Sequence, residues 1–322
     1  MKKQIPIYCA LTTLLLTGCA SKNKYGEERF LSEREQKSAL AKTKSPQYYG
    51  FHVFPVQGGI EYRGAARLHP NHQTDADFEK GQPVIKFRGK SSRLNGHALL
   101  DLSSPASWME FSTASDFGAT FMGMDEDVIP YRGNYAGDVK AYAAVVSQIR
   151  IDNLFMESIP LYVRMSIGGL GPFSRGIFEP NIDTVFGYDI LGLYETLQFD
   201  LRDEHVVLSS SHSYSPQEDL LMSAARIVPV QGYGLTVEGA IFGEATPIVL
   251  DIAGDYHFMR GDKNVSQTKQ VSIGDIVYRK VPTLPLPIDT ALPRAGRRML
   301  EKYIITVCPR QGYVYFEQYP EK

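Results

Sequence analysis

Two aspartates, Asp101 and Asp251, each directly follow a run of apolar residues. The run is Ala-Leu-Leu at residues 98–100 and Ile-Val-Leu at residues 248–250. Such runs are typical of buried strands, so both carboxylates are expected at strand ends. Two carboxylates about 3 Å apart cannot both ionise, and they share one proton. The ionised partner then accepts a proton from water while the protonated partner donates to a carbonyl.

The two aspartates belong to an internal repeat of six short segments that recur in the same order. Residues 53–58 (Val-Phe-Pro-Val-Gln-Gly) recur as residues 227–232 (Ile-Val-Pro-Val-Gln-Gly). The other pairs are 64–66 with 239–241, 98–101 with 248–251, 149–153 with 271–275, 182–184 with 288–290, and 187–191 with 296–300. Repetition in a fixed order indicates two related units. We expect an N-terminal half at 48–213 and a C-terminal half at 214–322.

Both halves are expected to be rich in β-structure. The chain of 322 residues contains 28 Gly and 19 Pro, which suits many turns. Short runs of β-branched or aromatic residues predict strands. These runs cover residues 84–87, 196–201, 205–208, 304–307 and 313–317. Helical periodicity is confined to residues 189–194 and 297–303, so the fold class is all-β.

The ordered segments resemble the aspartic peptidases of the pepsin and retropepsin type. In that family, each of two β lobes places an Asp at an active-site turn, followed by an outer strand pair, an apolar-apolar-Gly strand and a short helix. The resemblance covers about residues 51–318. It implies a two-lobed acid-protease barrel with an internal duplication, a dyad of Asp101 and Asp251, and no cofactor or metal. It also implies a flap over the cleft that carries Tyr131, Gly133 and Tyr135.

Both active-site turns depart from the family pattern. The family has Thr or Ser after the Asp, whose hydroxyl bonds across to the other lobe, but this chain has Leu102 and Ile252. The next residue is normally Gly, but here it is Ser103 or Ala253. An apolar Leu/Ile pair can instead pack across the lobe junction. The aspartates can also simply cap their own turns, as the flap glycines can simply form a hairpin.

Two functions therefore stay open. The absence of Thr or Ser and of Gly after both aspartates favours a protein that binds a peptide or an envelope component in the interlobe cleft, with degenerate or absent catalysis. The alternative is an active aspartic endopeptidase that uses the Asp101/Asp251 dyad. The formal net charge of −2 shows no basic excess, so nucleic acid is not an expected partner.

Other polar residues are assigned structural roles. Asp183 and Asp289 occupy equivalent places in the repeat but are expected in turns. His69 and His72, with Asp75 and Asp77, lack the spacing of a metal site and are expected in a solvated loop. His97 shares a strand face with Asp101 but is expected to be a satisfied surface histidine. Cys308 lies in an apolar run and is expected to be a buried small hydrophobe.

The N-terminus predicts export and lipidation. Lys2 and Lys3 precede an apolar stretch at residues 5–16, and Leu-Thr-Gly-Cys at 16–19 resembles a bacterial lipobox. Residues 1–18 then form a signal peptide, and Cys19 carries the lipid that anchors the chain in a membrane. Residues 19–47 form a polar tether, in which Ser32 can begin a short helix through a capping box. The expected location is the cell envelope, on the outer membrane of a Gram-negative bacterium.

Overall fold

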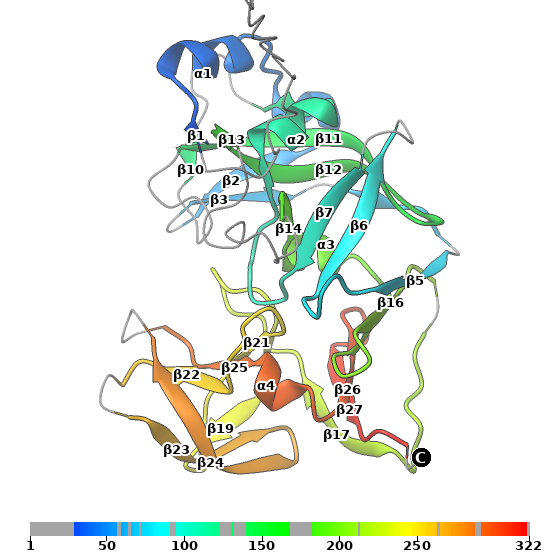
Figure 1. The fold of residues 1–322 in the computed structure, drawn as a ribbon, viewed down its shortest axis with the longest axis vertical. Coiled ribbons are helices and arrows are strands. Elements are labelled where there is room, and N and C mark those ends of the chain that lie inside the picture. Colours follow the sequence, from blue (N-terminus) through cyan, green and yellow to red (C-terminus); the bar gives the residue numbers. More distant parts are fainter. Residues whose placement is uncertain are drawn as a thin grey trace, which may run out of the picture.

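In a computed structural model, β-strands are the main secondary structure of the chain, with a few short helices (Figure 1). The structure describes residues 29–56, 59–63, 66–70, 72–90, 95–122, 130–131, 140–167, 182–211, 213–262, 265–286 and 291–320. Three large sheets account for most of the strands. The all-β class expected from the short β-branched runs and frequent turn residues is therefore confirmed.

A nine-stranded sheet occupies the upper part of Figure 1 and contains β7, the strand that immediately precedes Asp101. Its order is β10-β11-β6-β7-β14-β8-β12-β4, with β9 paired to β11. The strands are β4 (Arg67–Leu68), β6 (Val84–Gly89), β7 (Asn95–Leu100), β8 (Trp108–Glu110), β9 (Thr120–Phe121), β10 (Pro130–Tyr131), β11 (Ala141–Ile151), β12 (Leu154–Arg164) and β14 (Thr184–Phe186).

An eight-stranded sheet occupies the lower part of Figure 1 and contains Asp251. Its order is β18-β21-β25-β22-β24-β23-β19-β20. The strands are β18 (Thr236–Val237), β19 (Gly239–Ile241), β20 (Glu244–Ala245), β21 (Ile248–Asp251), β22 (Phe258–Arg260), β23 (Gln267–Ile273), β24 (Ile276–Pro285) and β25 (Arg294–Gly296).

These two sheets contain the same pattern of strand pairing. In the first, β7 pairs in parallel with β14, β14 antiparallel with β8, and β8 in parallel with β12. In the second, β21 pairs in parallel with β25, β25 antiparallel with β22, and β22 in parallel with β24. In both, the strand that leads to the aspartate lies against a short strand that ends beside a glycine.

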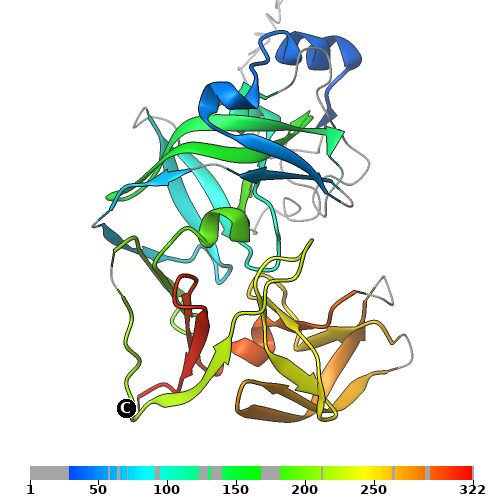
Figure 2. The same cartoon turned by 180° about the vertical axis from the view of Figure 1, so that it is seen from behind.

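A six-stranded sheet joins the two parts of the chain, and its order is β17-β27-β26-β15-β16-β5. Strand β15 pairs antiparallel with β26 from Leu197↔Val307 to Asp200↔Ile304, more than one hundred residues apart. The view from behind shows this sheet running between the upper and lower parts (Figure 2). The strands are β5 (Gln73–Asp77), β15 (Thr196–Asp200), β16 (His205–Ser209), β17 (Leu221–Arg226), β26 (Ile304–Cys308) and β27 (Tyr313–Glu317).

Smaller elements complete the described fold. Two-stranded sheets are formed by β1 (Arg29–Phe30) with β13 (Ser166–Ile167) and by β2 (His52–Val56) with β3 (Gly59–Arg63). The helices are α1 (Glu33–Leu40), η1 (Pro46–Tyr49, a 3-10 turn), α2 (Phe111–Asp116), α3 (Tyr188–Leu191) and α4 (Arg297–Leu300). No described helix is long and apolar enough to cross a membrane.

Several strands and helices lie where the local sequence patterns predicted them. The strands predicted at 84–87, 196–201, 205–208, 304–307 and 313–317 are confirmed as β6, β15, β16, β26 and β27. Helix α1 begins with the predicted capping box: Ser32 accepts a bond from the Glu35 N–H, and the Glu35 carboxylate accepts one from the Ser32 N–H. Helices α3 and α4 are confirmed but are shorter than predicted.

One expected loop is a strand. Residues 73–77, expected in a solvated loop, form β5 at the edge of the six-stranded sheet, paired with β16. Thr74 is buried and its neighbours on either side are exposed, so the side chains alternate as a half-buried strand requires. The polar composition of this segment concealed that alternation.

Candidate carboxylate pair between the two sheets

Asp101 lies immediately after β7, and its side chain is 3% exposed. The Asp101 N–H donates to the Phe186 carbonyl at 3.0 Å, which continues the pairing of β7 with β14. The carboxylate Oδ1 accepts bonds from the Ser103 N–H at 2.8 Å, the Ser103 hydroxyl at 2.7 Å and the Ser104 N–H at 3.2 Å. Ser103, which stands where the resemblance leads one to expect Gly, therefore supports the carboxylate with two donors.

Asp251 is the last residue of β21 and is 7% exposed. Its Oδ1 accepts a bond from the Gly254 N–H at 2.8 Å, and its Oδ2 accepts one from the Tyr256 hydroxyl at 2.6 Å. Tyr256 lies over the turn because two glycines leave room for its ring. A Cβ on Gly254 would lie 2.2 Å from the Tyr256 ring, and one on Gly296 would lie 2.5 Å from it.

The charge of Asp251 affects the ionisation of Asp101. Burial, followed by the neighbouring charge of Asp251, raises the pKa of Asp101 to about 7. Ser103 and the positive charge of Arg294 oppose this rise. Asp101 is therefore the carboxyl group that stays protonated up to near-neutral pH.

The residues that follow the two aspartates are part of the core. Leu102 and Ile252 are both fully buried and belong to one hydrophobic cluster that draws on both halves of the chain. The backbone fastens the first turn to the second half: the Leu235 N–H donates to the Leu102 carbonyl at 2.6 Å, and the Gly234 N–H donates to the Ser103 carbonyl at 3.2 Å. Apolar packing and main-chain hydrogen bonds thus hold the first turn against the second half of the chain.

The other residues of the resemblance are only partly described. Tyr131 ends β10 and pairs with Ala141 of β11, and nothing further is described of its side chain. Gly133, Tyr135, Asp289 and the candidate lipidation residue Cys19 lie outside the described residues. The flap and the lipid anchor therefore stay predictions.

Asp183 lies just before β14 and is fully buried. It accepts bonds from the His97 N–H at 3.2 Å and the Thr184 hydroxyl at 2.9 Å, so it fastens the start of β14 to β7. This structural role agrees with the prediction, although the residue bridges two strands instead of forming a turn.

The histidines are engaged elsewhere. His97 forms an ion pair with Glu79 at 3.5 Å, and His69 forms one with Glu157 at 3.5 Å. Among the described residues, no group of three or more His, Cys, Asp or Glu side chains is placed to hold a metal ion. Cys308 is fully buried, as expected, and burial raises the pKa of its thiol to about 11.

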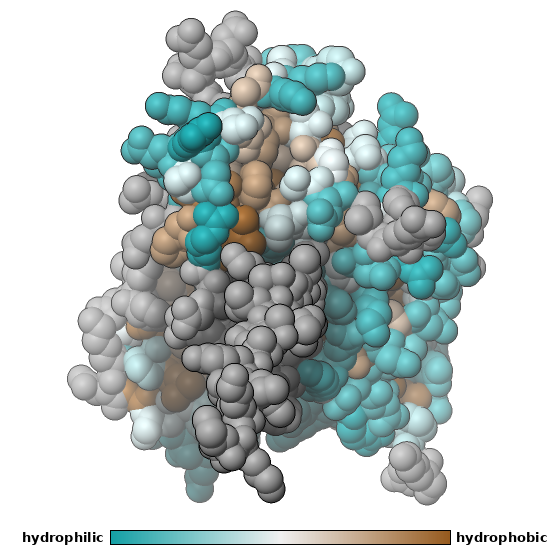
Figure 3. Space-filling model, turned by 45° about the horizontal axis from the view of Figure 1, so that its top comes forward, coloured by the Kyte–Doolittle hydropathy of each residue, from teal (hydrophilic) through white to brown (hydrophobic). Residues whose placement is uncertain are grey.

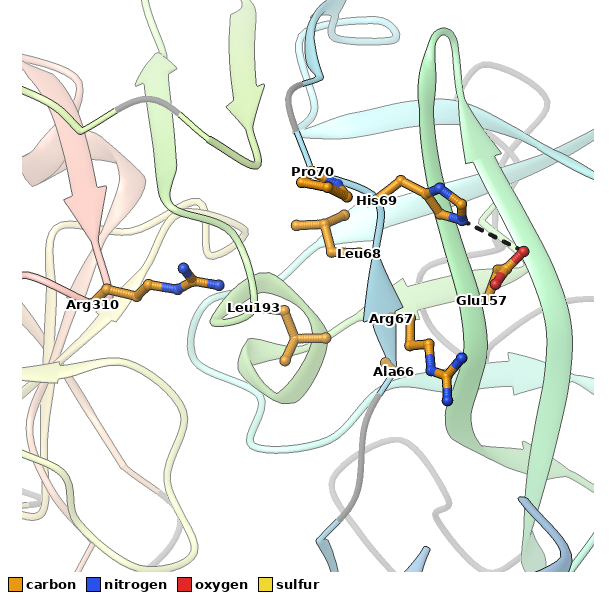
Figure 4. Close-up of a pocket in the computed structure, with 8 residues that line it drawn as sticks. All are labelled: Ala66, Arg67, Leu68, His69, Pro70, Glu157, Leu193 and Arg310. Carbon is orange, nitrogen blue, oxygen red and sulfur yellow. Dashed lines mark ion pairs between the residues drawn. The ribbon is translucent and has the colours of Figure 1, made fainter. Parts of the chain in front are cut away.

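Neither Asp101 nor Asp251 lines a surface hollow of about 470 Å³ elsewhere on the molecule. It is lined by Ala66, Arg67, Leu68, His69, Pro70, Glu157, Leu193 and Arg310 (Figure 4). Two of its charged groups pair with each other, His69 with Glu157, and Arg310 pairs with Glu195 at 3.1 Å. These side chains are largely exposed, so the hollow offers less than the buried carboxylate pair as a site for chemistry.

Comparison with known proteins adds no family: no protein-family model matches the chain, and no curated protein sequence is similar to it.

Two residues at the site were missed by sequence reasoning. Tyr256 lies five residues after Asp251, and Arg294 lies on β25 beside Val249 of β21. Neither belongs to a motif. Only the fold of the turn brings the Tyr256 hydroxyl back onto Asp251, and only the junction of the two halves brings Arg294 to Ser103.

Proposed function

We propose that the chain has a two-lobed, aspartic-peptidase-like architecture that arose by internal duplication. Support comes from the identical pairing pattern of the β7-β14-β8-β12 and β21-β25-β22-β24 strands. The six repeated sequence segments fall in the same order. The six-stranded sheet, which takes strands from both halves, supplies the junction between the lobes.

We propose that this protein hydrolyses peptide bonds with Asp101 and Asp251 as a catalytic dyad. The observation that carries the proposal is the burial of both carboxylates at equivalent strand ends, close enough for the charge of Asp251 to raise the pKa of Asp101. Because Asp101 keeps its proton to about pH 7, it is the acid that protonates the scissile carbonyl oxygen. Asp251 accepts a proton from water as the water oxygen attacks the carbonyl carbon.

A second candidate is peptide binding without cleavage. It is favoured by the Tyr256 hydroxyl, which donates to Asp251 Oδ2 at 2.6 Å. This bond holds the carboxylate in its turn and occupies the oxygen that would otherwise accept a proton from water. In this case the cleft holds a peptide or an envelope component, and the aspartates support the turns.

Cleavage of a proteome-derived peptide mixture by the full-length protein in detergent, followed by mass spectrometry between pH 3 and 8, tests the first proposal. We expect cleavage to fall by at least about 10²-fold in Asp101→Asn and in Asp251→Asn, because each variant lacks one half of the proton transfer. Asp219→Asn changes an exposed aspartate and is the matched control. Peptide binding that persists with no cleavage in any form favours the second candidate.

We also propose that a lipid on Cys19 tethers the protein to a membrane of the cell envelope, as the lipobox at residues 16–19 suggests. With the upper end of Figure 1 turned forward, the visible face shows hydrophilic residues on both sides of a hydrophobic stripe (Figure 3). In cells grown with radiolabelled palmitate, the wild-type protein should carry label and sediment with membranes. Cys19→Ala should lose both properties, because it lacks the thiol that accepts the lipid. Label in Cys19→Ala contradicts this proposal.

A further inference from the structure

Arg294 is a positively charged side chain at the centre of the candidate site. It lies at the start of β25, two residues before Gly296, which pairs with Asp251. Its Nη1 donates to the Ser103 hydroxyl at 3.4 Å across the junction between the two halves. Ser103 in turn donates to Asp101. Ser103 thus links the guanidinium to Asp101, and the positive charge of Arg294 opposes the rise in the pKa of Asp101 and of Tyr256.

The hydrogen-bonding capacity of Arg294 is largely unused. Its Nε is buried without a hydrogen-bond partner, and no ion pair to it is found in the described part of the chain. Three other arginines nearby in sequence each face a carboxylate: Arg260 faces Asp262 at 3.3 Å, and Arg297 and Arg298 face Asp255 at 3.5 and 2.9 Å. Arg294 is half-buried beside the two carboxylates, and its one hydrogen bond, to Ser103, leaves its buried Nε free to bind a ligand.

Charge balance identifies the class of ligand. Below about pH 7 Asp101 keeps its proton, so Arg294 faces at most one negative charge from the two aspartates. A planar guanidinium binds a carboxylate through two parallel hydrogen bonds, a geometry that no other cationic side chain offers. An anionic group beside the aspartates would otherwise be repelled by them. The positive charge of Arg294, which belongs to the second half of the chain, offsets this repulsion.

We propose that Arg294 binds a carboxylate of the peptide held at the Asp101/Asp251 pair, and so makes the site selective for acidic peptides. This inference rests on the proposal that the site takes a peptide. It adds the charge of the preferred peptide and the residue that recognises it. The carboxylate is either an Asp or Glu side chain next to the bond at the dyad or the C-terminal carboxylate of a short peptide.

The test measures binding, so that it stays separate from the test of cleavage. Two pools of decapeptides, randomised except for one central position fixed as Glu or Gln, are titrated onto full-length Asp101→Asn protein. Each pool is made with a free and with an amidated C-terminus. We expect the Glu pool, or the free-terminus pool, to bind about tenfold to a hundredfold more tightly than its neutral counterpart. A difference between the Glu and Gln pools identifies a side-chain carboxylate as the bound group. A difference between the free and amidated pools identifies the C-terminal carboxylate.

Adding Arg294→Met to this protein should reduce the ratio to about one, while Arg279→Met, which changes an exposed arginine on β24, should leave it unchanged. Thermal unfolding shows whether the Met variant is folded. If the Met variant is not folded, Arg294→Lys is measured in its place. Lys keeps the positive charge but lacks the two parallel donors, so a reduced preference for the acidic pool supports the proposal. Equal binding of acidic and neutral pools by Asp101→Asn protein, or an unchanged preference in folded Arg294→Met, overturns it.

Discussion

Asp101 and Asp251 have different surroundings although they occupy matching positions. Three donors from residues 103 and 104 converge on one oxygen of Asp101, whereas Asp251 uses one oxygen for a backbone N–H and the other for the Tyr256 hydroxyl. Burial and the charge of Asp251 nevertheless raise the pKa of Asp101 to about 7. Because hydrogen bonds to an ionised carboxylate favour that form, Asp101 owes its proton to burial and to its neighbour.

Asp251→Asn should lower the pKa of Asp101 below 7, because the neighbouring negative charge is lost while burial persists. Carboxyl ¹³C chemical shifts of labelled aspartate, followed from pH 3 to 9, measure this. Asp219→Asn is the control. An unchanged Asp101 titration contradicts the assignment of the two carboxylates to one pair.

The same shift has a consequence for stability. The folded-state pKa of Asp101 lies above its value in the unfolded chain, near 3.8, so the folded state binds the proton more tightly. The contribution of Asp101 to the free energy of unfolding is fully present below about pH 4 and is lost as the pH rises through 7. Asp101→Asn should therefore flatten the fall in stability between these values, as denaturant unfolding at a series of pH values would show.

The turn at residues 101–104 is held by a segment that lies far from it in sequence, just before β18. The Leu235 N–H and the Gly234 N–H bond to the carbonyls of Leu102 and Ser103, and Leu102 itself is buried. Gly234 permits this approach, because a Cβ there would lie 2.2 Å from the Leu102 carbonyl oxygen. Backbone hydrogen bonds and apolar packing between elements thus hold this turn in place. In the family that the sequence resembles, a Thr or Ser hydroxyl has this role.

Gly234→Ala should disturb the first turn, because the added methyl group collides with backbone that cannot move without shifting Asp101. We expect a loss of stability of about 1–3 kcal/mol and a loss of activity of about 10²-fold for a displacement near 1 Å. Gly232→Ala is the control: its left-handed backbone costs stability, but a Cβ there meets nothing within 4 Å. If both variants lose activity equally, the Gly234 contact does not position the dyad.

At the scale of the whole molecule, the six-stranded sheet makes the two halves one folding unit. Strands β5, β15 and β16 come from the first half, and β17, β26 and β27 come from the second. Their inward-facing residues, such as Phe199, Val307 and Phe316, are fully buried. Separating the halves would expose this surface and leave β15 and β26 as unpaired edges.

A protease site inserted at residues 213–217, which connect β16 to β17, should be cut without separating the pieces. The shared sheet and its apolar core keep the fragments together, so they should elute as one species in size-exclusion chromatography and separate only in denaturant. Fragments that elute apart under native conditions would show that the halves are independent domains.

The sequence by itself determined the local features of this protein. Apolar or β-branched runs predicted β6, β15, β16, β26 and β27, a Ser-x-x-Glu pattern predicted the start of α1, and an apolar setting predicted the burial of Cys308. It also singled out Asp101 and Asp251, because each follows an apolar strand in a repeated segment. These features depend on neighbours within a few residues, and such interactions leave a pattern in the sequence.

The tertiary structure alone decided what surrounds the two aspartates. Ser103 and Arg294 are 191 residues apart, and no pattern around either residue predicts the contact between them. Likewise, the polar segment 73–77 becomes strand β5 only because β16 offers it an edge to pair with. Such contacts depend on how distant elements pack, and one chain can meet the same local preferences in many arrangements until burial of the shared core selects one.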